Sequence, residues 1–211
     1  MPTKTFFNLP EEKRNRIINA ALEEFSENLF SKVSVNKIVK KSKISKGSFY
    51  QYFKNKKDLY KYILDKMFKL KMEYLSKVIK DKNTDDFFEL YEAMIEAGLK
   101  LTVDYPLYGK IGQNLMLEDE KFLAEIMENY SAQGENLIFP LLKKAQENGE
   151  IYENIDLKLV SFLISKSSIL LLDYIKTTTK DLNYENIINI INEFIFIIKN
   201  GIRRGKDDQN Y

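Results

Sequence analysis

The sequence contains no cysteine and no histidine among its 211 residues. Disulfides, thiolate nucleophiles and Cys/His zinc sites are therefore excluded, as are Ser-His-Asp triads and histidine general bases. Only four prolines and eight glycines interrupt the chain. Apolar residues recur at three- and four-residue steps almost throughout, and alternating strand patterns are nearly absent. These features favour an all-α protein, and we expect no metal site, no cofactor and no enzymatic activity.

Long apolar runs are also missing. The first residues, Met1–Phe7, lack the apolar run of a signal peptide. The most apolar later segment, residues 157–175, contains Lys158, Lys166, Asp173 and four serines, which makes it too polar and too short to span a bilayer. We therefore expect a soluble, cytoplasmic protein.

Acidic residues are absent from thirty consecutive positions, residues 28–57, which hold nine lysines. Residues 1–56 carry twelve Lys and Arg against five Asp and Glu, a net charge of +7, whereas residues 57–211 carry a net charge of −5. Unopposed positive charge on a compact helical segment suits a polyanionic partner. We therefore expect a nucleic-acid-binding head over residues 1–56 and a separate body over residues 57–211. The alternative is that the lysines form an ordinary solvated face.

The periodicity predicts about nine helices, most of them bounded by capping residues or glycines. Pro140 lies inside one of the longest and should kink it. Ser45 is expected to cap the third helix, and Asn55 is expected to cap the fourth. The predicted helices begin near residues 11, 35 and 46, cover about 56–80 and 87–103, begin again near 106, and cover about 119–148, 157–178 and 184–200.

The second and third predicted helices are separated by about four residues, Ser42–Ser45. That spacing fits a helix-turn-helix, in which the later helix enters the major groove of DNA. Phe49 and Phe53 form an i,i+4 apolar pair that should turn inward. The polar residues of the same helix should then face outward or sideways: Lys46, Ser48, Tyr50, Gln51 and Tyr52.

The outward residues carry the chemistry that reads duplex DNA. Gln51 can bond an adenine edge through two hydrogen bonds, and Lys46 can reach guanine acceptors or phosphate. Gly47 has no side chain, so the backbone can approach the DNA closely. Lys56 at the start of the next helix can hold a phosphate with its charge and the nearby backbone N–H groups. Residues suited to phosphate oxygens and thymine methyls are Ser48, Tyr50 and Tyr52.

The segment Ser45–Leu59, SKGSFYQYFKNKKDL, resembles the recognition helix and following turn of TetR-type (tetracycline-repressor-like) transcriptional regulators. Residues 18–25, INAALEEF, and 34–38, SVNKI, resemble the first and second helices of that family in order and spacing. The resemblance covers about residues 10–64. It implies a DNA-binding homodimer whose C-terminal body binds a small molecule and then releases the operator. By position, it implies DNA contacts at Ser34, Ser45, Lys46, Gly47, Ser48, Tyr50, Gln51, Tyr52 and Lys56.

Two positions depart from the family pattern. Leu29 replaces the glycine that usually precedes the aromatic residue at Phe30, and Lys43 replaces the glycine usual in the turn. If Lys43 adopts a left-handed backbone, the turn is slightly strained. If it does not, the angle between the two helices differs from that of the family.

The last two predicted helices are more apolar than one monomer needs. A helix that is apolar almost all round is buried on more than one side. Two such helices suit a four-helix interface with a symmetry mate, which would place two recognition helices about 34 Å apart. The alternative is that they form the monomer core. The residues predicted to lie in the interface are Phe162, Ile169, Leu172, Ile187, Ile191, Phe194 and Ile198.

Methionine and aromatic residues among small polar groups in the body can line an apolar ligand cavity. At helical spacing, such residues also fit a plain core. The predicted pocket residues are Tyr91, Met94, Ile95, Leu115, Met116, Met127, Tyr130, Ser165 and Ser168.

The sequence thus predicts a ligand-responsive transcriptional regulator, a repressor that binds a palindromic operator as a homodimer and is released by a small lipophilic effector. The alternative is a constitutive DNA-binding or architectural protein without an effector. A third option, a helical enzyme that uses carboxylates such as Glu92 and Glu96, has no accompanying set of acid, base and oxyanion donors in the sequence.

Overall fold

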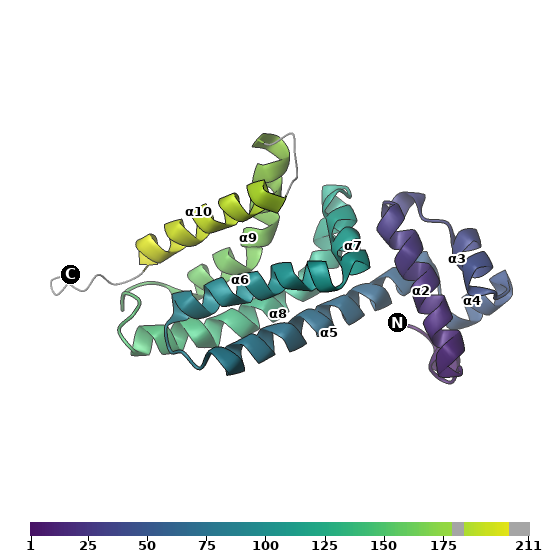
Figure 1. Ribbon diagram of the computed structural model, residues 1–211, viewed down its shortest axis with the longest axis horizontal. Helices are drawn as coiled ribbons and strands as arrows, with labels where there is room; N and C mark the ends of the chain where they lie inside the picture. Colours follow the sequence, from purple (N-terminus) through teal and green to yellow (C-terminus); the bar gives the residue numbers. More distant parts are fainter. Residues whose placement is uncertain (179–183, 203–211) are drawn as a thin grey trace. The chain divides into compact units, whose positions relative to one another are not determined.

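The computed structural model describes residues 1–178 and 184–202. Within these ranges it leaves out the side chains of residues 129, 131, 132, 168, 169, 172, 173, 175, 176, 184, 185 and 187. Ten α-helices and one 3-10 helix make up the regular structure of the described residues, which include no β-strand (Figure 1). The all-α prediction is therefore confirmed. The elements are α1 (Lys4–Phe7), α2 (Glu11–Glu27), η1 (Phe30–Lys32), α3 (Val35–Ser42), α4 (Lys46–Tyr52), α5 (Lys56–Lys82), α6 (Phe87–Asp104), α7 (Pro106–Met116), α8 (Glu120–Glu147), α9 (Leu157–Thr178) and α10 (Tyr184–Ile202).

The nine predicted helices correspond to α2–α10, with ends that differ by a few residues at most. Asn55 caps α5 as expected, because its side-chain oxygen accepts the Asp58 N–H at 2.9 Å. α8 continues through Pro140, and the predicted kink there stays a prediction. The sequence analysis missed α1 and η1, because elements of three or four residues are too short to show a helical period.

The backbone divides into two compact units. The first comprises residues 1–77 and 97–126, and the second comprises residues 78–96 and the chain from residue 127 onward. α5 begins at Lys56, where the sequence analysis placed the end of the head, and belongs to the first unit as far as Lys77.

An aromatic core holds the first unit together. Phe49 and Phe53 are fully buried with ring centroids 5.5 Å apart, which confirms their predicted inward orientation. Phe25 of α2 packs with its ring centroid 4.8 Å from that of Tyr60 on α5. Burial of rings of this size is the largest favourable contribution available to a small helical unit. α2 is thereby fixed against α5, whereas α3 packs on α2 and α4 packs on α1 and α3.

The second unit contains the first part of α6, residues 87–96. Phe87 and Phe88 are buried at its start, and the Glu150 carboxylate caps it by accepting the Phe87 N–H at 3.0 Å through both oxygens. Burial raises the pKa of Glu150, and the neighbouring Asp86 adds to this shift. Lys199 of α10 forms an ion pair with Glu92 of α6 at 3.5 Å. Among the described residues, no helix is both long enough and apolar enough to cross a membrane.

The turn between α3 and α4 depends on a left-handed residue. Lys43 has φ 54° and ψ 45°, and the N–H of the following Ile44 bonds the Val39 carbonyl at 3.1 Å, which closes the end of α3. Lys43 therefore adopts the left-handed backbone, which is the case in which the sequence predicts a slightly strained turn. Leu29, the other departure from the family pattern, has φ −58°, so this position has no need for glycine.

Replacing Lys43 with glycine is expected to stabilise the first unit by about 0.5–1 kcal/mol. Glycine removes the cost of a left-handed L-residue, which is about 1–2 kcal/mol. The greater backbone entropy that glycine loses on folding offsets part of this gain. Thermal unfolding followed by circular dichroism measures the change. Lys40→Gly, in the regular backbone of α3, is the matched control and should lower stability. Equal losses for both variants would contradict a strained turn.

Candidate nucleic-acid interface

α3, the turn and α4 form a helix-turn-helix that packs on α2 at one end of the first unit (Figure 1). Ser45 is the N-cap of α4, as predicted: its Oγ accepts the Ser48 N–H at 3.0 Å. The two hydroxyls also bond each other at 2.9 Å. This cap fixes the first turn of a helix only seven residues long, which would be marginal without such support.

One face of α4 is open to solvent. Lys46, Gly47, Tyr50 and Gln51 are exposed, and Tyr50 retains 51% of its accessible surface. A Cβ atom added at Gly47 would come no closer than 3.8 Å to Ser45 Oγ, so packing within the protein does not require glycine there. The exposed residues are of the kinds that bond base edges and phosphates.

Tyr52 does not belong to this face. The prediction that its side chain points outward or sideways is wrong, because Tyr52 is only 4% exposed. It lies three residues after Phe49 and therefore shares the inward face of the helix. Its ring packs 6.2 Å from that of Phe6 in α1, and the Lys13 ammonium lies 5.8 Å from its centroid. Tyr52 is thus a core residue and is removed from the predicted DNA contacts.

Lys56 is also occupied within the protein. Its ammonium donates to the carbonyl oxygens of Phe30 at 2.6 Å, Val33 at 3.0 Å and Ser31 at 3.4 Å, and lies 4.5 Å from the Phe30 ring centroid. An ammonium has three donors, and three carbonyls use them. Burial lowers the pKa of Lys56. The predicted phosphate contact through this side chain is therefore wrong: Lys56 fastens the segment that leads into α3.

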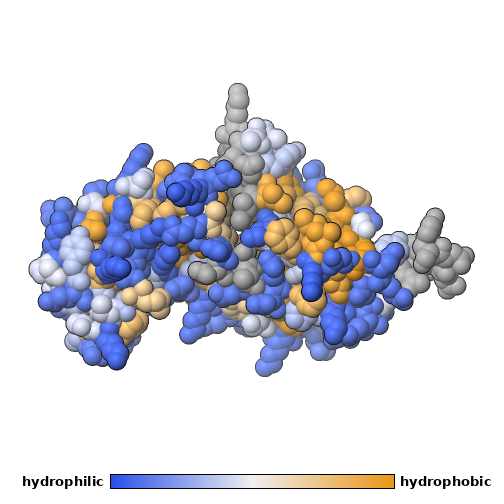
Figure 2. Space-filling model, turned by 180° about the vertical axis from the view of Figure 1, so that it is seen from behind, coloured by the Kyte–Doolittle hydropathy of each residue, from blue (hydrophilic) through white to orange (hydrophobic). Residues whose placement is uncertain are grey.

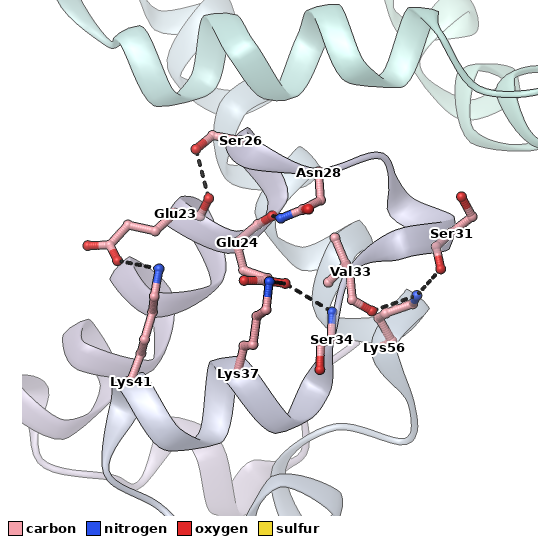
Figure 3. A network of polar contacts seen from close by, with 10 residues as sticks. All are labelled: Glu23, Glu24, Ser26, Asn28, Ser31, Val33, Ser34, Lys37, Lys41 and Lys56. Carbon is pink, nitrogen blue, oxygen red and sulfur yellow. Dashed lines mark hydrogen bonds and ion pairs between the residues drawn. The ribbon is translucent and has the colours of Figure 1, made fainter.

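A buried acid sets the start of α3 (Figure 3). Ser34 is the N-cap residue, but its side chain makes no capping bond. Instead, Glu24 Oε1 accepts the Ser34 N–H at 3.1 Å and lies 3.8 Å from the Lys37 ammonium. Glu24 is fully buried, and its Oε2 has no hydrogen-bond partner within the described structure. The half-buried Ser34 hydroxyl takes no part in this cap, and its predicted DNA contact stays a prediction. Glu24 lies next to Phe25 on the face of α2 that is otherwise apolar. An acidic residue at such a position is the sequence feature that could have indicated the buried carboxylate.

Ion pairs reduce the free charge of the lysine-rich stretch. Lys37 faces Glu24, Lys41 pairs with Glu23 at 3.1 Å, and Lys57 pairs with Glu125 at 2.5 Å. The hydrogen bond that the Lys41 ammonium donates to the Glu23 carboxylate is the main reason that the pKa of Lys41 is raised. Five lysines of the stretch are exposed and have no ion pair among the residues that the structure describes: Lys32, Lys40, Lys43, Lys46 and Lys54.

Residues far along the chain hold the helix-turn-helix in place. Asn114 Nδ2 of α7 donates to the carbonyls of Phe25 and Ser26 at 3.0 Å, at the end of α2. Glu118 accepts the Phe30 N–H at 2.5 Å. These bonds brace the chain just before Ser34. They join residues about 88 positions apart, which sequence periodicity does not reveal.

The predicted pocket residues divide between the two units. Leu115 and Met116 lie on α7 of the first unit, where Leu115 is buried. Ser168 lies in α9, outside the residues whose side chains are described. The remaining residues belong to the second unit: Tyr91, Met94, Ile95, Met127, Tyr130 and Ser165.

Within the second unit, Tyr91 and Met94 are buried on α6, and burial raises the pKa of Tyr91 to about 12. Ser165 Oγ on α9 is buried and has no hydrogen-bond partner within the described structure. A buried hydroxyl without a partner costs free energy unless something else bonds it.

The structure describes the side chains of four of the seven predicted dimer residues. Phe162 is 47% exposed on α9, whereas Ile191, Phe194 and Ile198 are half-buried on α10. Ile169, Leu172 and Ile187 lie outside the residues whose side chains are described. Further apolar residues exposed on these two helices are Leu159, Leu163, Leu170, Tyr174, Phe196 and Ile197.

Figure 2 shows a dense group of apolar residues in the right half of the face seen there, with further apolar residues scattered over the rest of that face. The most exposed on α10 are Phe196 at 67% and Ile197 at 65%, which lie on the same face of this helix as Asn192 and Glu193. Exposed apolar residues in such numbers on neighbouring helices mark an interaction surface. The predicted interface set had not included Phe196 or Ile197.

The fold and the exposed α4 face define a helix-turn-helix DNA-binding protein. The family model described as "Bacterial regulatory proteins, tetR family" matches residues 17–63. The chain is 32% identical over 160 residues to the fatty acid metabolism regulator protein of Bacillus subtilis strain 168, an alignment that covers 72% of this chain and 77% of the relative. It is 29% identical over 203 residues to the HTH-type transcriptional regulator QacR of Staphylococcus aureus strain Mu50, with 90% and 98% covered.

A solved structure gives the same result. The TetR family transcriptional regulator from Chloroflexus aurantiacus J-10-FL is 27% identical, with a TM-score of 0.60 over 97% of this chain and 100% of that one. The chain therefore belongs to the TetR family of bacterial regulatory proteins, and it is a DNA-binding transcriptional regulator. The resemblance found in the sequence is confirmed.

Proposed function

We propose that this regulator represses transcription as a cytoplasmic homodimer that binds a palindromic operator through α4 and leaves it when a small lipophilic effector binds. Residues 1–56 supply the DNA-binding head, and residues 57–211 supply effector binding and dimerisation. The observation that carries the proposal is the exposed α4 face with Lys46, Tyr50 and Gln51, adjoined by lysines that have no ion pair in the described structure. No step of this function requires catalysis.

Two substitutions on α4 separate affinity from sequence preference. Lys46→Ala is expected to weaken binding to every duplex about tenfold and to reduce the slope of log affinity against log salt by about 1, because it removes a phosphate contact. Gln51→Ala should cost about 1–3 kcal/mol on the preferred operator and relax the preference for one base pair. Titration of labelled duplexes at several salt concentrations measures both.

The control is Lys110→Ala, an exposed lysine on α7 outside the helix-turn-helix. It should leave operator affinity and base preference unchanged. Equal effects of Lys46→Ala and Lys110→Ala would contradict the assignment of α4 as the reading helix.

For the effector, we propose a site in the second unit formed by Tyr91, Met94 and Ser165, with the half-buried Ile95, Met127 and Tyr130 around them. Apolar walls with one unpartnered hydroxyl suit a ligand with a long apolar part and a single polar group. The relative that is named for regulating fatty acid metabolism supports a fatty acyl compound as this ligand.

Native mass spectrometry of the purified protein, with and without an added long-chain fatty acid, tests the effector. We expect one bound acyl chain per protomer and dissociation of the operator complex on addition. Binding of the acid with no effect on the operator complex, or no binding, would favour the constitutive alternative.

A further inference from the structure

We propose that Thr3, placed by the N-terminal segment that the buried Phe6 anchors, is a positioning residue for operator recognition: it holds the C-terminal end of α4 in the orientation that reads the bases. The proposal rests on α4 being the reading helix. Thr3 itself is a positioning residue and need not touch the DNA.

The C-terminal end of α4 depends on Thr3 for its hydrogen bonds. The last carbonyls of a helix have no partners within it. Thr3 Oγ1 donates to the Gln51 carbonyl at 2.8 Å, and the Thr3 N–H donates to the Tyr52 carbonyl at 2.9 Å. Gln51 is the residue expected to read a base. Thr3 therefore holds the main chain of the reading residue itself.

The same threonine connects α4 to α1. Thr3 is the N-cap of α1, and its Oγ1 accepts the Phe6 N–H at 3.4 Å while its hydrogen is donated to Gln51. The Thr3 hydroxyl therefore serves both helices: it accepts a hydrogen bond from α1 and donates one to α4. Arg14 of α2 donates to the Phe7 carbonyl at 2.9 Å and ties the far end of α1 to the core.

Phe6 anchors this segment. It is fully buried, and its ring centroid lies 4.8 Å from Phe53, 5.5 Å from Tyr62 and 6.2 Å from Tyr52. The position of Thr3 at the end of α4 is thus fixed by aromatic packing.

α4 has only seven residues, so its own hydrogen bonds give it little stability. Ser45 caps one end and Thr3 holds the other. If the second support is lost, the last turn, which carries Gln51, samples more conformations. Binding to the matched operator then has to order this last turn, and the cost lowers affinity. An unrelated duplex, held mainly by phosphate contacts, should be affected less.

The test compares Thr3→Val with Thr3→Ser. Valine keeps the shape and the backbone N–H but removes the hydroxyl, whereas serine keeps the hydroxyl. We expect Thr3→Val to reduce affinity for the matched operator about five- to tenfold and to reduce the ratio of matched to single-mismatch affinity, because one hydrogen bond that orders α4 is lost. Thr3→Ser should restore both. Thr5→Val, an exposed threonine of α1, is the matched control and should change neither.

Amide hydrogen exchange supplies a readout that does not involve DNA. The Phe53 N–H, which closes α4 by bonding the Phe49 carbonyl at 2.8 Å, should exchange faster in Thr3→Val than in the wild type or Thr5→Val. Wild-type discrimination and wild-type exchange in Thr3→Val would overturn the proposal. If the wild-type protein itself does not discriminate between matched and mismatched operators, the proposed function fails, and faster exchange at Phe53 would still show that Thr3 orders α4.

Discussion

Replacing Phe196 with glutamate is expected to convert the protein to a monomer and to lower operator affinity by at least about a hundredfold. Phe196 is 67% exposed on α10, beside Ile197, and we propose that the exposed apolar residues of α9 and α10 form the dimer surface. A two-fold interface contains each substitution twice, so the loss of about 2 kcal/mol of apolar burial per phenylalanine is doubled. Each new carboxylate would also have to be desolvated. Monomers bind the two half-sites independently and therefore lose the affinity that a dimer gains by binding both half-sites at once.

Analytical ultracentrifugation gives the oligomeric state, and titration of the operator gives the affinity. Val103→Glu is the matched control, because Val103 is 68% exposed on α6 and lies outside α9 and α10. The control should remain dimeric and bind the operator as the wild type does. A Phe196→Glu protein that stays dimeric would show that the proposed surface is not the interface.

Tyr52→Ala is expected to destabilise the first unit by about 3–4 kcal/mol, because a buried aromatic ring is removed from a packed core. Tyr52 is 4% exposed and packs against Phe6. Tyr50→Ala, only two residues away, should cost at most about 1 kcal/mol, since Tyr50 is half-exposed and packs edge-on against Phe49 at 5.2 Å. Its effect should instead be a loss of operator affinity of about tenfold, from one lost contact to phosphate.

Urea denaturation followed by circular dichroism separates the two variants, and operator titration is carried out where both are folded. Tyr52→Phe, which keeps the ring, is the control and should retain most of the stability of the wild type. Similar stability losses for Tyr50→Ala and Tyr52→Ala would mean that the division of α4 into an outer and an inner face is wrong.

Most of the fold could be predicted because the long helices carry strong periodic signals with local caps. Phe49 and Phe53 indicated the inner side of α4 by spacing alone, and Ser45 and Asn55 indicated where α4 and α5 begin. Such signals act over three or four residues, so they can be read from the chain. α1, with four residues, gives no such period.

The errors at the site have one physical cause: distant segments compete for side chains that look available in the sequence. Tyr52 was expected to face outward because α1, which covers it, was not foreseen. Lys56 was expected to hold phosphate, but three carbonyls near η1 hold its ammonium. Glu24 and Asn114 position the helix-turn-helix through contacts 10 and about 88 residues away along the chain. Tertiary contacts of this kind follow from the folded arrangement and have no local pattern.

The most direct test of the central claim is selection of binding sites from a pool of random duplexes, followed by footprinting on the enriched sequence. If two α4 faces in a dimer read the DNA, the selected sites should converge on an inverted repeat, with both half-sites protected and their centres about 10 bp, or a multiple of one helical turn, apart. Gln51→Ala should shift the enriched base at one position of each half-site. A pool that shows no inverted repeat after selection would contradict the account.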